Sequence, residues 1–276
     1  MNQNWIVENL NNAFSTWYGK LSELWGLVTT SPEHFKGGAV WAIMQTLHNA
    51  MVGIGYALIV LFFAISLFKN TANFHELKRP EAALHYLIRF VAAKALVGYG
   101  MDLMLTIFSI CNGIVSNMAS SMGGISQAMI SLPGEIQTAI ESVGFLASIP
   151  LWLVTILGSL FITVLSFVMV LTVYSRFFRL YMYTALAPVP LSTFAGDSTQ
   201  SVGISFLKSY IGVCLEGAVI VLACIIYSGF VSSPAVSTGE TTSVVSPYLA
   251  ESIFNMLVLV GLVKGSDRII HEMMGL

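Results

Sequence analysis

Long apolar segments alternate with short polar stretches along this chain. Each segment has, or approaches, the roughly 20 residues that an α-helix needs to cross the hydrocarbon core of a bilayer. They lie at about residues 40–68, 83–113, 148–174, 208–230 and 248–264, and the last is the shortest. The pattern predicts an all-α, polytopic membrane protein with about five transmembrane helices.

Residues 5–28 have apolar and polar side chains on opposite sides of a helix. The apolar side holds Trp5, Ile6, Leu10, Phe14, Trp17, Tyr18, Leu21, Leu24, Trp25 and Val28. Three tryptophans and one tyrosine suit the water–lipid boundary, where both the ring and its polar group are satisfied. We therefore expect residues 1–38 to form an external amphipathic helix lying in the interface, and residues 39–276 to form the membrane domain. The alternative is that this helix packs on the helix bundle itself.

Residues 125–147 are only half apolar and contain Glu135 and Glu141. This composition favours a second, external interfacial helix over a membrane span. The apolar segments do not repeat one another, so the inverted-repeat signature of many transporters is missing.

The composition fits a membrane protein and no soluble class. The chain is 56% hydrophobic and only 9% charged, with a mean hydropathy of +0.80, whereas a soluble domain has about 25% charged residues. A net charge of −2 gives no sign of a nucleic-acid surface. Cys111, Cys214 and Cys224 lie in or beside apolar runs without a CxxC motif, so we expect packed thiols rather than disulfides or metal ligands.

Basic residues predict the orientation in the membrane. The polar stretches on one side hold Lys69, Lys78, Arg79, Arg176, Arg179, Lys208, Lys264 and Arg268. Residues 114–147 and 230–247 contain no lysine or arginine, so the positive-inside rule places these two loops outside the cell. Five spans then place the N-terminus outside and a short tail, residues 264–276, in the cytoplasm, with Arg176, Arg179 and Lys208 as anchors on the cytoplasmic side. Lys20 and Lys36 are outnumbered exceptions.

The stretch RFFRLYMYTALAPVPLSTFAG, residues 176–196, contains Pro188 and Pro190 within an apolar run. A proline inside a helix removes a backbone hydrogen bond and clashes with the preceding turn. Residues 180–194 are too few to cross the membrane twice, and a single crossing would reverse the predicted orientation. We expect a proline-broken segment, residues 180–196, that enters the membrane partially from the cytoplasmic side or lies on its inner surface. A plain cytoplasmic loop is the alternative.

Four ionisable residues lie within the predicted spans, where charges are costly and mark pathways or pairings. Arg89, Lys94 and Asp102 are in the second span, and Glu216 is in the fourth. Arg89 is near the cytoplasmic end and can snorkel to the interface. Lys94 lies ~16 Å from that end, at a depth comparable to that of Glu216. We therefore predict a Lys94–Glu216 pair, which is either structural or part of a polar conduit lining.

No catalytic or cofactor-binding pattern is convincing. His75 and Glu76 lack the second histidine of an HExxH motif, and Asp267 and His271 have no recognisable nucleophile beside them. A glycine-rich phosphate loop is missing as well. We expect a protein that is not an enzyme and needs no cofactor or metal.

The pattern as a whole resembles the polytopic inner-membrane subunit of type IV secretion and conjugation systems, the TrbL-like family. It is most similar to the short form on conjugative elements of Gram-positive bacteria. The residues that carry the resemblance are the amphipathic N-terminus, SRFFRLYMYTALAPVPLSTF after the third span, and the ending LVKGSDRIIHEMMGL. We expect this short form to lack the long soluble C-terminal domain of larger relatives.

The resemblance implies a non-enzymatic channel or platform subunit of a mobile genetic element. It also implies a homo-oligomeric ring, five-fold in related machines, that works with other conjugation subunits and their ATPases to move DNA–protein substrates. Two other classes stay open from the residues alone. A small-solute or ion transporter would be indicated by paired broken helices, and an intramembrane enzyme would be indicated by a nucleophile–base pair.

Overall fold

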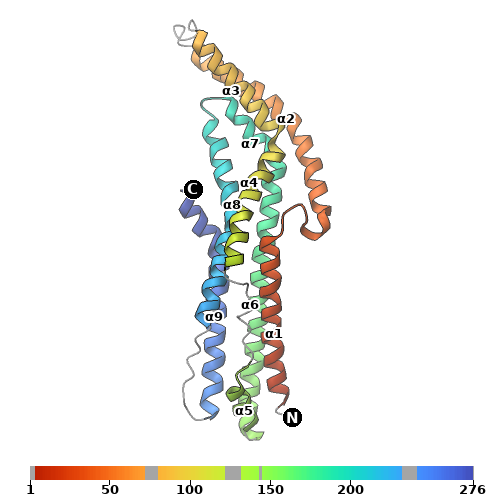
Figure 1. Ribbon diagram of the computed structural model, residues 1–276, viewed down its shortest axis with the longest axis vertical. Coiled ribbons are helices and arrows are strands. Elements are labelled where there is room, and N and C mark those ends of the chain that lie inside the picture. The colour runs from red at the N-terminus through yellow and green to blue at the C-terminus, as the bar shows by residue number, and fades with distance from the viewer. Residues whose placement is uncertain (1–3, 72–79, 122–131, 143–144, 232–240, 276) are drawn as a thin grey trace. The chain divides into compact units, whose positions relative to one another are not determined.

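The computed structural model describes residues 4–71, 80–121, 132–142, 145–231 and 241–275, and every regular element in these ranges is a helix. The α-helices are α1 (Asn4–Thr29), α2 (Ala39–Thr71), α3 (Pro80–Gly98), α4 (Gly100–Ser121), α5 (Gly134–Ser142), α6 (Phe145–Leu186), α7 (Pro188–Ser192), α8 (Gln200–Val231) and α9 (Thr241–Met274) (Figure 1). Two short 3-10 helices, η1 (Phe35–Gly38) and η3 (Thr193–Ala195), complete them. The predicted all-α class is confirmed. Lys78, Arg79 and residues 125–131 lie outside the described ranges.

The described residues contain five helices that are long and apolar enough to cross a membrane, as predicted. They are Phe35–Lys69, Gly100–Ser120, Ile149–Leu186, Gln200–Val231 and Val245–Met274. The third and fourth extend beyond the predicted ends at residues 174 and 208. Arg176, Arg179 and Lys208 therefore lie on helices α6 and α8 instead of in the turn between two spans.

The predicted second span, residues 83–113, is divided at Tyr99 into α3 and α4. The backbone stays nearly helical there, because the Tyr99 N–H donates to the Ala95 carbonyl at 2.8 Å and the Tyr99 carbonyl accepts from Leu103 at 2.9 Å. Of the two helices, α4 alone has the composition of a membrane span. Arg89 and Lys94 lie on α3, which continues almost without a break into that candidate span.

The chain divides into two compact units. The first comprises Met1–Thr29, Val115–Ser175 and Gly217–Ser266, and the second comprises Thr30–Ile114, Arg176–Glu216 and Asp267–Leu276. Helices α4, α6, α8 and α9 each contribute residues to both units.

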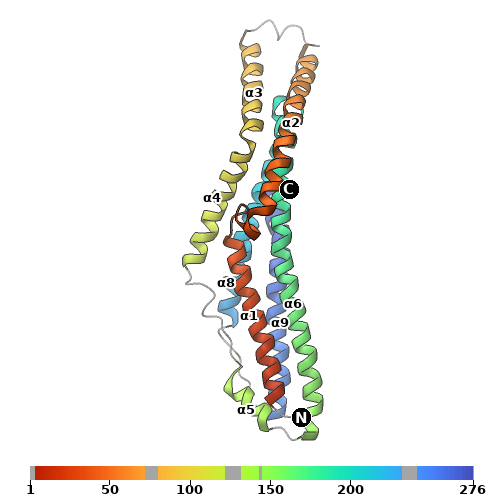
Figure 2. The ribbon, with the colours of Figure 1, turned by 90° about the vertical axis from the view of Figure 1, so that its right-hand side faces the viewer.

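In the first unit, α1 runs alongside α6 (Figures 1 and 2). The Asn9 amide donates to the Ser159 hydroxyl at 3.2 Å, and the Trp5 and Trp152 rings lie 5.9 Å apart. On the same side, Trp17 is fully buried and contacts Tyr227 of α8. The buried residues of α1 are Ile6, Val7, Leu10, Ala13, Phe14, Trp17, Leu21, Leu24 and Val28.

This packing corrects the expectation of an interfacial helix at residues 5–28. The apolar side of α1 is covered by protein and not by lipid, which is the alternative left open by the sequence. Helix α5 in turn packs against α1 and buries Ile136, Ala139 and Ile140.

In the second unit, α7 packs against both α2 and α3. Gly55 makes this approach possible, since a Cβ atom at that position would lie 2.9 Å from the Pro188 carbonyl oxygen and 2.9 Å from Val97. Both distances are too short for a side chain, so the backbone of α2 contacts the start of α7 directly.

Candidate functional site

The proline segment, residues 187–199, joins α6 to α8 within the second unit. Helix α6 ends at Leu186, and Pro188 is the first residue of α7, a position that suits proline because the first N–H groups of a helix have no intrahelical acceptor. Pro188, Leu191 and Ser192 are buried. The segment is thus a short, packed helix followed by one turn of 3-10 helix, and not a solvated loop.

His48 of α2 replaces the backbone hydrogen bond that Pro188 cannot make. In a regular helix the N–H of residue 188 would donate to the carbonyl of Thr184, four residues earlier. Proline has no N–H, and the His48 Nδ1 lies 2.7 Å from the Thr184 carbonyl oxygen instead. His48 is 2% exposed, so this bond is made out of contact with water. The Nδ1 atom is therefore the protonated nitrogen of the ring.

Arg89 of α3 fastens the other end of the proline segment. Its Nε donates to the Phe194 carbonyl at 3.0 Å, and its guanidinium pairs with Asp197 and donates to the Gln200 side chain. Ser66 of α2 donates to the same Asp197 carboxylate at 3.3 Å. Arg89 therefore holds the turn before α8, and its place near the membrane surface stays a prediction.

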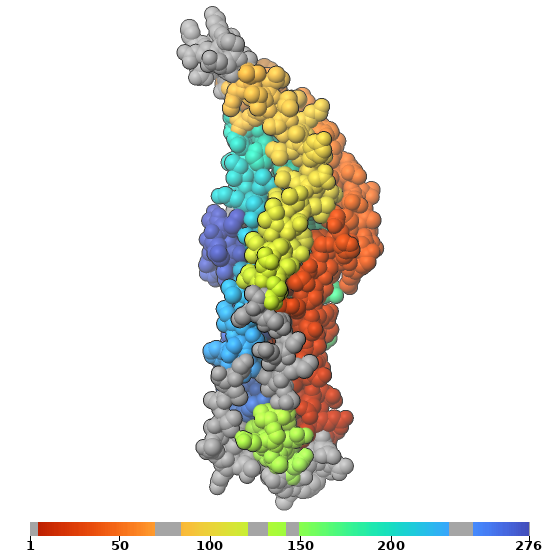
Figure 3. All heavy atoms as spheres, in the orientation of Figure 1, coloured from red at the N-terminus to blue at the C-terminus, as the bar shows by residue number. Residues whose placement is uncertain are grey.

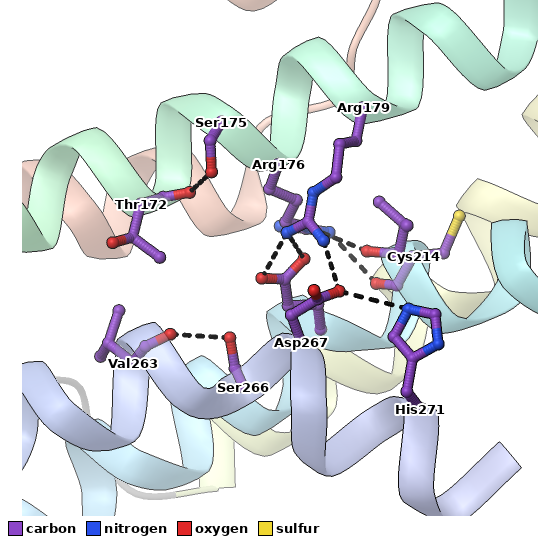
Figure 4. A network of polar contacts seen from close by, with 11 residues as sticks. Thr172, Ser175, Arg176, Arg179, Cys214, Val263, Ser266, Asp267 and His271 are labelled. Carbon is purple, nitrogen blue, oxygen red and sulfur yellow. Dashed lines mark hydrogen bonds and ion pairs between the residues drawn. The ribbon is translucent and has the colours of Figure 1, made fainter. Parts of the chain in front are cut away.

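Arg176 and Arg179 form the centre of a second polar group, the arginine cluster, which also contains Glu216 and Asp267 (Figure 4). Arg176 is 1% exposed, and its Nε and Nη2 donate to the carbonyls of Val213 and Cys214 at 3.2 and 3.1 Å. A buried guanidinium satisfied by backbone carbonyls binds α6 to α8. That Arg176 is an anchor on the cytoplasmic side of the membrane stays a prediction.

Arg179 binds two carboxylates from two other helices. Its Nη2 lies 2.8 and 2.6 Å from the two oxygens of Glu216, and its Nη1 pairs with Asp267. The Glu216 carboxylate is 1% exposed, whereas Asp267 is 44% exposed and also lies 3.5 Å from the His271 Nε2. Two arginines and two carboxylates give the cluster a balanced charge, and Arg179 joins α6, α8 and α9 within this unit.

The predicted Lys94–Glu216 pair is corrected by this geometry. Glu216 is bound by Arg179, and the Lys94 side chain is exposed on α3. The prediction paired Lys94 with Glu216 because they lie at similar depths in the predicted spans. The third span was predicted to end at residue 174, so Arg179 was not considered as a partner. Asp102 on α4 and Lys208 on α8 are exposed as well.

Several residues of these groups were not predicted as site residues, among them His48, Asp197 and Asp267. A signal existed only for His48, because Pro188 leaves a carbonyl that needs a donor from elsewhere. Nothing in the sequence tells which donor supplies it. Within the ranges that the structure describes, no three His, Cys, Asp or Glu side chains lie together as a metal ion would require.

Comparison with known families gives one match. The model for the TrbL/VirB6 plasmid conjugal transfer-like proteins matches residues 18–188, more than half of the chain, from within α1 to the first residue of α7. The ending LVKGSDRIIHEMMGL lies beyond the matched range. No curated protein and no solved structure matches the chain significantly. With its five candidate spans, the chain is a multi-pass membrane protein and a conjugal transfer component, and it belongs to the TrbL/VirB6 plasmid conjugal transfer-like family.

Proposed function

We propose that the chain is a channel or platform subunit of a conjugative type IV secretion system, which helps to move DNA–protein substrates across the cell membrane. Beyond the family match, one observation carries the proposal: Lys94 of α3 and Asp102 of α4 are exposed. Figure 3 shows the two helices as the yellow and yellow-green band. Asp102 lies in the first turn of a candidate span, and Lys94 precedes it by eight residues.

Lipid is a poor neighbour for this surface. Charged side chains at membrane depth face other protein or a water-filled cavity, because hydrocarbon cannot solvate them. A subunit of a larger secretion machine offers both kinds of neighbour, whereas a monomer surrounded by lipid offers neither. We propose that Lys94 and Asp102 face another subunit or a passage.

We further propose the assembly and orientation that follow from the resemblance and the basic residues. The chain forms a homo-oligomeric ring, five-fold by resemblance, and contacts other conjugation subunits, including their ATPases. Its N-terminus lies outside and its C-terminus lies in the cytoplasm, as the lysine- and arginine-free stretches support.

The proline segment provides the test of the functional proposal. Replacing Pro188 and Pro190 together with alanine lets α6 continue as a regular helix, because alanine is the best helix former. The five candidate spans are unchanged, so we expect normal abundance in the membrane. The frequency of DNA transfer should fall, because the chain between α6 and α8 no longer presents the same surface to its partners.

The matched control is Pro247→Ala in α9, which changes an exposed proline near the start of a helix. We expect this control to keep both its abundance and its transfer frequency. Normal transfer by the double variant at normal abundance would show that the proline segment is an ordinary connection, and the functional role assigned to it would be wrong.

A further inference from the structure

Helix α1 lies beside a long apolar part of α6 in the first unit. Helix α6 has no charged residue from Ile149 to Ser175, and its exposed side chains from Ile149 to Leu171 are apolar. Exposed examples are Leu153, Leu157, Leu160, Val164, Phe167 and Leu171. A run of this length and composition is long enough to span the hydrocarbon core.

Helix α1 runs in the same direction as this part of α6. Trp5 contacts Trp152, and Asn9, one turn further on, binds Ser159, which is also further on in α6. Ser159 is ten residues past Ile149, or ~15 Å at 1.5 Å per residue, which is about half the thickness of the hydrocarbon core. Asn9, near the start of α1, therefore lies beside a part of α6 that is ~15 Å inside the candidate span, and the rest of α1 follows the span in the same direction.

The side of α1 that faces away from the unit is polar over the same length. Its exposed polar residues are Glu8, Asn11, Asn12, Ser15, Thr16 and Ser22, and the exposed apolar exception is Trp5 at the start of the helix. On the same helix Lys20 and Glu23 form an ion pair at 2.7 Å, each about one third exposed. Hydrocarbon offers no hydrogen-bond partner to the Glu8 carboxylate or to the side-chain amides of Asn11 and Asn12, so lipid is a costly neighbour for this side of α1.

We propose that the polar side of α1 lines a water-filled passage in the assembled protein. One side of α1 packs on α6 and α8, and the opposite, polar side lines the passage. Water is the occupant favoured by the residues themselves, since carboxylate, amide and hydroxyl groups recur along the exposed side. This inference rests on the proposed function, in which the chain is part of a conduit.

Cysteine reactivity tests the passage directly. The three native cysteines are buried, so they give a low background. We would compare Ser15→Cys on the polar side of α1 with Phe167→Cys on the exposed apolar side of α6, using a membrane-impermeant methanethiosulfonate reagent on right-side-out and inside-out vesicles. Only the thiolate reacts, and it forms readily in water but not in lipid, so Ser15→Cys should react ~10-fold faster or more from at least one side.

Each other result overturns the proposal in its own way. Equal fast reaction at both positions would place the whole first unit in water, and equal slow reaction would place α1 against lipid or protein. A disulfide between two copies of the Ser15→Cys chain under mild oxidation would show that the polar side meets a second copy. The proposed function is tested separately, by the transfer frequency of Ser15→Cys cells before and after modification with a bulky reagent. Fast reaction without a loss of transfer would keep the passage and refute its use by the DNA–protein substrate.

Discussion

The hydrogen bond between His48 and the Thr184 carbonyl should contribute most to the free energy of unfolding when residue 188 is a proline. The bond is 2.7 Å long, and its histidine is 2% exposed. Removing the donor from a buried carbonyl costs about 1–3 kcal/mol, so we expect His48→Leu to lower the free energy of unfolding by about 2 kcal/mol. At about 2 °C per kcal/mol for a chain of this size, the melting temperature should fall by about 4 °C.

The cost should shrink when Pro188 is replaced by alanine. Ala187 has φ −48° and ψ −40°, which are helical values, so an amide N–H at position 188 would point at the Thr184 carbonyl. This N–H supplies the donor that His48 provides in the native chain. The same His48→Leu change in the Pro188→Ala background should therefore cost ~1 kcal/mol or less, which leaves a coupling of ~1–2 kcal/mol between the two positions.

The assay is thermal unfolding of the detergent-solubilised protein, followed by circular dichroism, for the native chain, the two single variants and the double variant. His85→Leu, at an exposed histidine on α3, serves as the control and should change little in either background. An equal loss from His48→Leu in both backgrounds would refute the reasoning, because the histidine would then not be compensating for the proline.

Two further measurements address the arginine cluster and the orientation. Arg179→Met leaves the Glu216 carboxylate buried without its partner and should destabilise the solubilised protein by about 3–5 kcal/mol. Arg268→Met, in an exposed ion pair, should cost at most about 1 kcal/mol. Similar melting temperatures for the two variants would contradict the stabilising role of the arginine cluster. A cysteine at Ser237, which lies outside the described residues, should react with a membrane-impermeant thiol reagent on intact cells. A cysteine at the exposed Met273 should react only after the membrane is opened. The opposite labelling would reverse the predicted orientation.

The helices could be predicted from the sequence because each leaves a local pattern. A run of apolar residues, or a side of apolar residues repeating every 3.6 positions, is visible without knowledge of the neighbours. The proline break was visible for the same reason, since Pro188 lacks a backbone donor whatever surrounds it. The helix ends were harder. Arg176 and Arg179 look like the end of a span by their charge, although they are satisfied inside the protein and the helix continues past them.

The partners of the polar residues could not be predicted, because they depend on which helix sides meet. Glu216 was assigned to Lys94 by depth, yet Arg179 reaches it from α6. The environment of α1 was misjudged on similar grounds. Its apolar side, with Trp17 at the centre, suits either a lipid boundary or a groove between helices, and only the contacts with α6 and α8 decide between them.

The stretch from Arg176 to Pro188 owes its residue types to contacts outside its own helix. Arg176 needs several donors to satisfy two backbone carbonyls of α8 at once, which the ammonium group of a lysine cannot do in the same plane. Position 179 requires an arginine because the two terminal nitrogens of its guanidinium group donate to two carboxylates from different helices. Pro188 frees a carbonyl, and His48 of α2 takes it. Between Arg176 and Pro188 the chain therefore makes polar contacts with α8, α9 and α2. The direction in which it leaves α6 is set by these contacts within the second unit as well as by the prolines.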